Sequence, residues 1–172
     1  MMNPAPLPAQ HPAPVTTYIG VGSNLADPVH QVTSALDSLE SFPGTRLVAR
    51  SHLYRSPPFG HLDQPDFINA VAHIETTLDP ETLLSELLRL EQAHGRVRLL
   101  ANGPRTLDLD ILMYGTECHQ NAHLTLPHPR LAQRSFVLLP WLDVAPETLV
   151  IPGQGTIARL LSNCPGPMAL PL

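Results

Sequence analysis

Residues 103–111 read Gly-Pro-Arg-Thr-Leu-Asp-Leu-Asp-Ile, and this stretch predicts a strand with two unlike faces. Side chains alternate in direction along a strand, so the two leucines and the isoleucine point to one side and can be buried. Asp108 and Asp110 then share the opposite side, with Cα atoms about 6.6 Å apart, which is two strand rises. The stretch therefore predicts a core strand that presents a pair of carboxylates.

The carboxylate pair has a functional and a structural interpretation. Two carboxylates this close repel each other, so they favour a cation, and their oxygens can converge on one or two divalent ions. Arg105, just upstream, could instead be the partner of the pair, in a salt bridge on the solvated face of an edge strand. An arginine beside such a pair is also what a phosphate-handling site requires. With Gly103 and Pro104 in front, the functional interpretation is favoured.

Working outward from this strand, the pattern of apolar residues and turn residues predicts two helices and three more strands. Both helices begin at an Asp-Pro pair, which supplies an N-cap and a first helical residue. The elements in chain order are a strand over 16–21, a helix over 28–39, strands over 45–54 and 67–77, a helix over 80–93 and the strand ending at Tyr114. This βαββαβ order predicts a ferredoxin-like α+β sandwich, an antiparallel sheet with both helices on one face. Further helices near 131–139 and 157–161 are expected as C-terminal additions at its edge.

Length and composition predict one soluble domain. The chain has 172 residues, 43% of them hydrophobic, and no window approaches the roughly 18 apolar residues of a membrane helix. We expect a Pro-rich flexible tail over 1–14, a single domain over 15–163 and a loosely ordered tail over 164–172. Cys118 and Cys164 are too few for a disulfide framework, which fits a cytoplasmic protein.

The charged residues restrict the possible ligands. A net charge of -5 predicts neither a nucleic-acid nor a membrane partner. All ten basic residues are arginine, so a P-loop nucleotide site, which needs its lysine, is excluded. Any phosphate site in this chain must use arginine, backbone amides and metal.

Two further segments leave alternatives open. Gly20 to Asn24 follow a strand and precede a helix, but Leu25 stands where a dinucleotide fingerprint needs its third glycine, so a tight turn and direct ligand contact both remain possible. His128 lies in Leu-Pro-His-Pro-Arg, which proline keeps out of a helix interior. It can donate to a phosphate or ribose, or anchor its own loop.

Taken together, five segments resemble the 6-hydroxymethyl-7,8-dihydropterin pyrophosphokinases of folate biosynthesis, over roughly Thr17 to Glu147. The segments are Tyr-Ile-Gly-Val-Gly-Ser-Asn-Leu at 18–25, Tyr-Arg-Ser-Pro-Pro at 54–58, Asp-Gln-Pro-Asp-Phe-Ile-Asn at 63–69, the nonapeptide at 103–111 and Leu-Pro-His-Pro-Arg-Leu at 126–131. One departure is that the segment 99–102 is a residue shorter than in well-known members and lacks their tryptophan.

The resemblance implies transfer of a diphosphate group from ATP, the co-substrate, to the hydroxymethyl oxygen of a reduced pterin, with AMP released by a cytoplasmic monomer. It implies that Asp108 and Asp110 hold two Mg²⁺ ions. It also implies that Arg96 and Arg105 bind the phosphates and stabilise their developing negative charge. The residues implied to face ATP are Glu91, Arg98, Ile111, Thr125, His128 and Arg134. Those implied to hold the pterin, stacked between two phenylalanine rings, are Ser56, Pro57, Phe59, Phe67, Asn69 and Phe136.

Two other classes of function share parts of this pattern. A nucleotidyl or glycosyl transferase that uses Asp-x-Asp would need the metal site but not Phe67, Asn69 and Phe136. A catalytically silent binding module could use the same scaffold, because a fold does not fix a function. The identity of the nucleotide product distinguishes such a transferase from a pyrophosphokinase. A turnover assay distinguishes a silent binding module from an enzyme.

Overall fold

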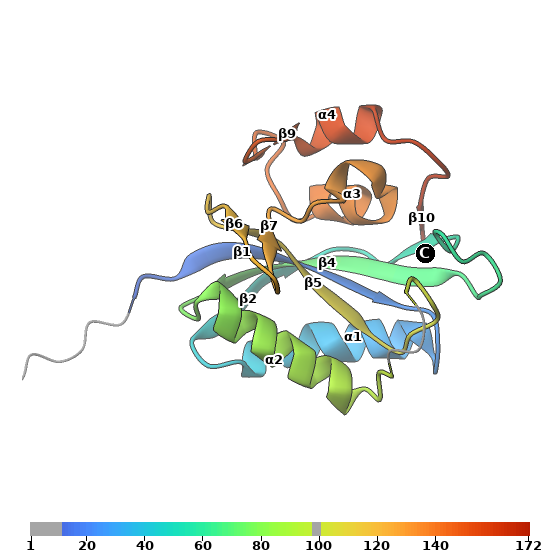
Figure 1. Cartoon of the computed structure of the whole chain (residues 1–172), viewed down its shortest axis with the longest axis horizontal. Helices are drawn as coiled ribbons and strands as arrows, with labels where there is room; N and C mark the ends of the chain where they lie inside the picture. Colours follow the sequence, from blue (N-terminus) through green and yellow to red (C-terminus); the bar gives the residue numbers. More distant parts are fainter. Residues whose placement is uncertain (1–11, 98–100) are drawn as a thin grey trace, which may run out of the picture.

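The computed structural model describes residues 12–97 and 101–172, and a six-stranded antiparallel sheet forms their centre (Figure 1). Its strands run in the order β10-β3-β4-β1-β5, and β2 also pairs with β4. They are β1 (Val15–Ser23), β2 (Thr45–Arg50), β3 (Tyr54–Ser56), β4 (Phe67–Thr76), β5 (Asp108–Tyr114) and β10 (Leu170–Pro171). The α+β sandwich expected from the sequence is confirmed.

One face of the sheet carries α1 (Pro28–Ser38) and α2 (Pro80–Ala93). Both helices start as predicted, since Asp27 and Asp79 each accept a backbone N–H with the side chain and a proline follows. The core side of α1 includes the buried Val32 and Leu36, whereas Val29 in its first turn is 41% exposed. The apolar side of β5 packs into this core as its alternation predicted.

The other face of the sheet is covered by α3 (Ser135–Leu142), with α4 (Ile157–Ser162) outside it (Figure 1). The fully buried Trp141 of α3 packs there with Tyr18 and Val71. The sequence placed these helices at the edge of the sheet, and that placement is wrong because both faces of β1 and β4 carry apolar side chains that need cover. The result is a sheet between two helical layers.

Two predicted boundaries also shift. The strand predicted over 45–54 breaks in two, because the hydroxyl of Ser51 accepts the N–H of Val71 at 2.9 Å in place of a strand carbonyl. The turn predicted at residues 22–24 starts later, since β1 stays paired with β4 through Ser23. The left-handed residues that follow are Ala26 and Asp27, with φ of 53° and 60°.

The C-terminal segment, expected as a loosely ordered tail, contributes one short edge strand to the sheet. Ala169 is buried and donates its N–H to the hydroxyl of Ser135 at 3.1 Å, and β10 pairs with β3. Leu172 donates its N–H to Leu53 O at 2.9 Å. The predicted N-terminal tail lies mostly outside the described residues.

Short elements complete the described chain. They are the 3-10 helices η1 (Leu39–Ser41) and η2 (Leu131–Gln133), the hairpin β6 (His119–Gln120) with β7 (Thr125–Leu126), and the hairpin β8 (Val150–Ile151) with β9 (Gly155–Thr156). In the part of the chain that the structure describes, none of the helices has the length and hydropathy to span a bilayer.

Candidate active site

The carboxylates of β5 line an open cavity of about 410 Å³ at one end of the sheet. Asp108 and Asp110 pair across the ladder with Gly22 and Gly20 of β1. Residues opposite each other in a ladder share a face, and the two glycines place no side chain of their own beside the carboxylates. The strand alternation predicted from the sequence therefore produces a hollow with an acidic wall.

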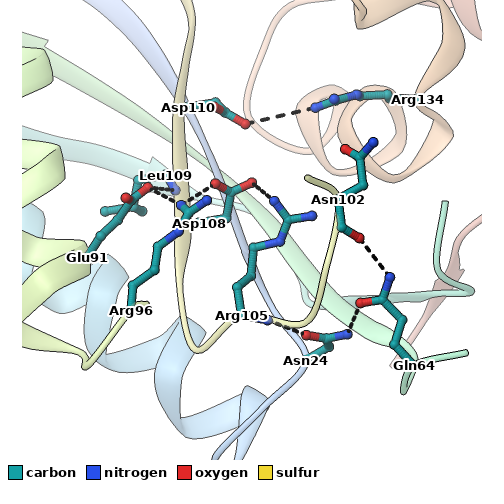
Figure 2. Close-up of polar contacts among 10 residues, drawn as sticks. All are labelled: Asn24, Gln64, Glu91, Arg96, Asn102, Arg105, Asp108, Leu109, Asp110 and Arg134. Atoms are coloured by element: carbon teal, nitrogen blue, oxygen red, sulfur yellow. Dashed lines mark hydrogen bonds and ion pairs between the residues drawn. The ribbon is translucent and has the colours of Figure 1, made fainter. Parts of the chain in front are cut away.

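Arg96 connects α2 to this wall (Figure 2). Its Nη1 donates to Glu91 Oε1 at 2.7 Å and to Asp108 Oδ1 at 2.6 Å, and its side chain is only 9% exposed. Glu91, on the last turn of α2, also accepts the backbone N–H of Leu109 at 2.9 Å. This buried carboxylate fixes both the strand and the arginine, so the guanidinium is held at the edge of the cavity.

Two more arginines approach the carboxylates from loops. Arg105 Nη1 donates to Asp108 Oδ2 at 3.3 Å, and Arg134 Nη1 lies 3.9 Å from Asp110 Oδ2. The Nε atoms of both arginines are buried without a hydrogen-bond partner among the described residues. Each guanidinium therefore keeps donor capacity that an anionic ligand can use.

The two carboxylates differ in how well they are neutralised. Asp108 has two arginine contacts, whereas Asp110 has one, at the longer distance. Burial, and next the charge of Asp108, raise the pKa of Asp110 from 3.8 to about 7. The negative charge of ionised Asp110 is therefore incompletely neutralised, and a bound cation would neutralise it.

His128 contributes a neutral imidazole to the cavity. Burial, and next the charge of Arg134, lower its pKa to about 4. Its Nδ1 accepts the backbone N–H of Arg130 at 3.2 Å, which places the ring proton on Nε2. Nδ1 thus anchors the loop of His128, which is one of the two roles that the sequence left open, and donation from Nε2 to a phosphate or ribose stays a prediction.

A narrower second cavity, of about 60 Å³, opens beside the first. Phe67 and Phe136 line it, and each ring carries a guanidinium, that of Arg105 at 5.2 Å and that of Arg134 at 5.7 Å from the ring centroid. In its wall, Asn69 Nδ2 donates to Ser56 Oγ at 2.8 Å. The slot combines aromatic faces with a fixed amide, which suits a planar heterocycle that carries amide-type hydrogen-bonding groups.

Comparison with known proteins identifies the family. The family model for 7,8-dihydro-6-hydroxymethylpterin-pyrophosphokinase (HPPK) matches residues 18–146. The chain belongs to the HPPK family. Its members are ATP-dependent pyrophosphokinases of folate biosynthesis, and the chain is an enzyme of this kind.

Relatives and solved structures agree with this assignment. The chain is 49% identical to 2-amino-4-hydroxy-6-hydroxymethyldihydropteridine pyrophosphokinase of Haemophilus influenzae, over 87% of this chain and 92% of the relative. It is 48% identical to the protein of that name from Pseudomonas aeruginosa, over 86% of this chain and 91% of the relative. A crystal structure of wild-type Plasmodium falciparum HPPK-DHPS has the same fold, with a TM-score of 0.68 at 14% identity, over 87% of this chain and 44% of that chain.

The first cavity contains most of the residues that the sequence assigned to ATP and catalysis. Those in its wall are Arg96, Arg105, Asp108, Asp110, His128 and Arg134. Glu91 lies behind Arg96, and Ile111 points into the core on the other face of the sheet, so only its backbone is free to face a nucleotide. Thr125 lies in β7 and is not part of this wall, and Arg98 lies outside the described residues.

The slot contains the whole set that the HPPK resemblance assigned to the pterin. Its wall includes Ser56, Pro57, Phe59, Phe67, Asn69 and Phe136. The sequence missed Asn102, which lines both cavities, although Asn before Gly in a loop between two assigned arginines was an available signal. It also left open whether Asn24 belongs to a turn or to the site.

Asn24 joins the loops around the site (Figure 2). Its Oδ1 accepts the N–H of Arg105 at 2.9 Å, and its Nδ2 donates to Gln64 Oε1 at 2.9 Å and to Pro65 O at 3.0 Å. The residue is therefore a support for the arginine loop and for the loop that flanks the slot.

Proposed function

We propose that this site transfers the β- and γ-phosphates of ATP together to the hydroxymethyl oxygen of 6-hydroxymethyl-7,8-dihydropterin and releases AMP. The observation that carries the proposal is that the two cavities share part of their walls. Arg105, Asp108 and Arg134 line both. A nucleotide in the larger cavity and a pterin in the slot would therefore meet beside these charges.

The carboxylate pair fits magnesium. Among the described residues no cluster of three or more His, Cys, Asp or Glu forms a complete metal cage. Mg²⁺ is commonly bound by one or two carboxylates, with substrate phosphates and water as its other ligands. We propose that Asp108 and Asp110 hold two Mg²⁺ ions in this way. When bound, these ions neutralise phosphate charge and align the triphosphate.

The arginines supply the remaining charge. Arg96 and Arg105 now donate to Asp108, and we propose that they turn to the phosphates when the carboxylate receives a cation. Phosphoryl transfer depends on alignment and charge neutralisation more than on a strong base. His128 would donate from Nε2 to the nucleotide, and Arg134 would hold the phosphate nearest Asp110.

In the slot, the pterin would lie between the rings of Phe67 and Phe136, where the guanidiniums now rest. Asn69, oriented by Ser56, would hydrogen-bond to the amide edge of the ring. We further propose that the enzyme is a cytoplasmic monomer, because residues of one chain line both cavities and the two cysteines are free thiols.

Product analysis tests the reaction. The enzyme is incubated with Mg²⁺, ATP and the pterin alcohol, and the nucleotides are resolved by chromatography. We expect AMP and pterin diphosphate in equal amounts, and no turnover when EDTA is added. ADP as the stoichiometric product would mean attack at the γ-phosphorus and would refute the proposed transfer.

A further inference from the structure

Asn102 lies where the two cavities meet. Four residues line both, and three of them, Arg105, Asp108 and Arg134, carry charges whose roles follow from phosphate chemistry. The fourth is Asn102, a neutral amide on the loop just before Gly103. A side chain at this boundary faces the place where a group would pass from the nucleotide to the pterin.

The backbone of Asn102 is held in one position. Its φ is 54°, in the left-handed region that asparagine tolerates better than most residues. Its carbonyl oxygen accepts Gln64 Nε2 at 2.8 Å, and Gln64 is in turn bound by Asn24 (Figure 2). These contacts use the main chain of Asn102 and leave its carboxamide available.

That carboxamide makes no hydrogen bond to any residue that the structure describes, although it borders two polar cavities. In Figure 2 it extends from the loop toward the side of the site where Arg134 lies. Gly60 packs beside it, so that a Cβ at Gly60 would come 3.5 Å from Asn102 Nδ2. An exposed amide at the border of both cavities can offer its N–H groups to a ligand oxygen.

We propose that the carboxamide of Asn102 contacts the substrates directly, with Nδ2 donating to a non-bridging oxygen of the β-phosphate, whose phosphorus is attacked. This inference rests on the proposed function and adds one neutral donor to the arginines. A donor at the junction of the cavities stays close to that phosphate as its bond to the nucleotide breaks and its bond to the pterin oxygen forms. Its contribution should therefore appear in turnover more than in ATP binding.

The competing explanation is that Asn102 only shapes its turn. Glycine adopts a positive φ more readily than asparagine, so Asn102→Gly keeps the turn and removes the amide. Asn102→Ala removes the amide and also strains the turn. Asn102→Asp keeps the shape but places a negative charge beside phosphate. Asn163→Gly makes the same chemical change at the exposed end of α4, away from both cavities, and serves as the control.

Steady-state formation of AMP is measured for these variants, together with binding of a non-hydrolysable ATP analogue. For Asn102→Gly we expect kcat to fall about 10- to 100-fold, which is what one hydrogen bond to a charged group is worth, while binding of the analogue changes less than about threefold. Asn102→Asp should be slower still, and Asn163→Gly should match the wild type.

The result that would overturn the inference is an Asn102→Gly enzyme with wild-type kcat, whether or not Asn102→Ala is impaired. Equal losses of kcat and of analogue affinity in Asn102→Gly would also overturn it. Thermal unfolding of each variant confirms that folded enzymes are compared. If the wild-type chain itself forms no AMP, the proposed function fails, and that outcome is distinct from failure of the Asn102 contact.

Discussion

Substituting Asp110 by asparagine should stabilise the ligand-free protein above pH 7, whereas the same change at Asp108 should destabilise it. Ionised Asp110 is poorly compensated, because Arg134 is 3.9 Å away, while Asp108 contacts Arg96 at 2.6 Å and Arg105 at 3.3 Å. Asparagine resembles the protonated form of Asp110 and so removes a repulsion. At Asp108 it removes a charged partner of a guanidinium that is largely buried.

The magnitude follows from the pKa of Asp110. A rise from 3.8 to about 7 would correspond to about 4 kcal/mol for a fully buried group, since each pKa unit is worth about 1.4 kcal/mol. The side chain is 36% exposed, so solvent screening reduces this figure, and we expect about 1 kcal/mol. For Asp108→Asn we expect a loss of about 1 to 3 kcal/mol.

The pH dependence has a definite sign. The pKa of Asp110 is raised in the folded state, so between about pH 4 and about pH 7 the folded chain keeps a proton that the unfolded chain has released. The wild type therefore loses stability as the pH increases through this range. The advantage of Asp110→Asn should therefore be greatest at pH 8 and small at pH 5. Below pH 4 both states are protonated and the advantage disappears.

Urea unfolding in EDTA at pH 5 and pH 8 measures these differences. The chain has a single tryptophan, the fully buried Trp141 of α3, so its fluorescence reports unfolding from a position on the other side of the sheet from α1 and α2. The reasoning is refuted if Asp110→Asn is as destabilising as Asp108→Asn at pH 8, or if its advantage is the same at both pH values.

Three further outcomes are expected. Arg105→Ala should lower kcat about 100-fold but weaken binding of an ATP analogue less than about fivefold, because its contact strengthens as charge develops on the transferred group; equal losses would contradict this. Asn69→Ala should raise the KM for the pterin at least about tenfold and leave that for ATP unchanged, and a change in both would argue against its place in the slot. Glu91→Gln should lower the free energy of unfolding, measured in urea, by about 2 kcal/mol, because Glu91 is 3% exposed and neutralises Arg96. Glu86→Gln, which breaks the more exposed ion pair with Arg89, should lower it by less than about 0.5 kcal/mol.

Local patterns were sufficient to predict much of this fold. The Asp-Pro pairs predict both helix starts because capping and the fixed φ of proline act within a few residues. The alternation at 103–111 predicts which side of β5 is buried for the same reason. The position of α3 was predicted wrongly, since an apolar helix does not indicate which face of a sheet it covers. Only the contact of Trp141 with Tyr18 settles this.

In the site, too, the sequence predicts the local features but not those that depend on contacts between distant segments. The carboxylate pair and its neighbouring arginine are adjacent in sequence, so spacing predicts them. The unequal neutralisation of Asp108 and Asp110 depends on Arg96 and Arg134, which come from the segment after α2 and from the segment before α3. Asn102 and Asn24 act through a hydrogen-bonded chain between loops, and no periodic pattern marks such contacts.

The shared walls of the two cavities have a consequence for resistance to inhibitors. A compound in the slot that we propose for the pterin would touch Asn69. This residue also packs against β1, because a methyl group at Gly22 would come 3.1 Å from Asn69 Oδ1. A substitution that prevents such a compound from binding by moving this amide would also weaken binding of the substrate. Changes at Arg105 or Arg134 would damage both cavities at once. Escape mutants should therefore carry a large fitness cost, and an organism that depends on this enzyme would have few routes to tolerance.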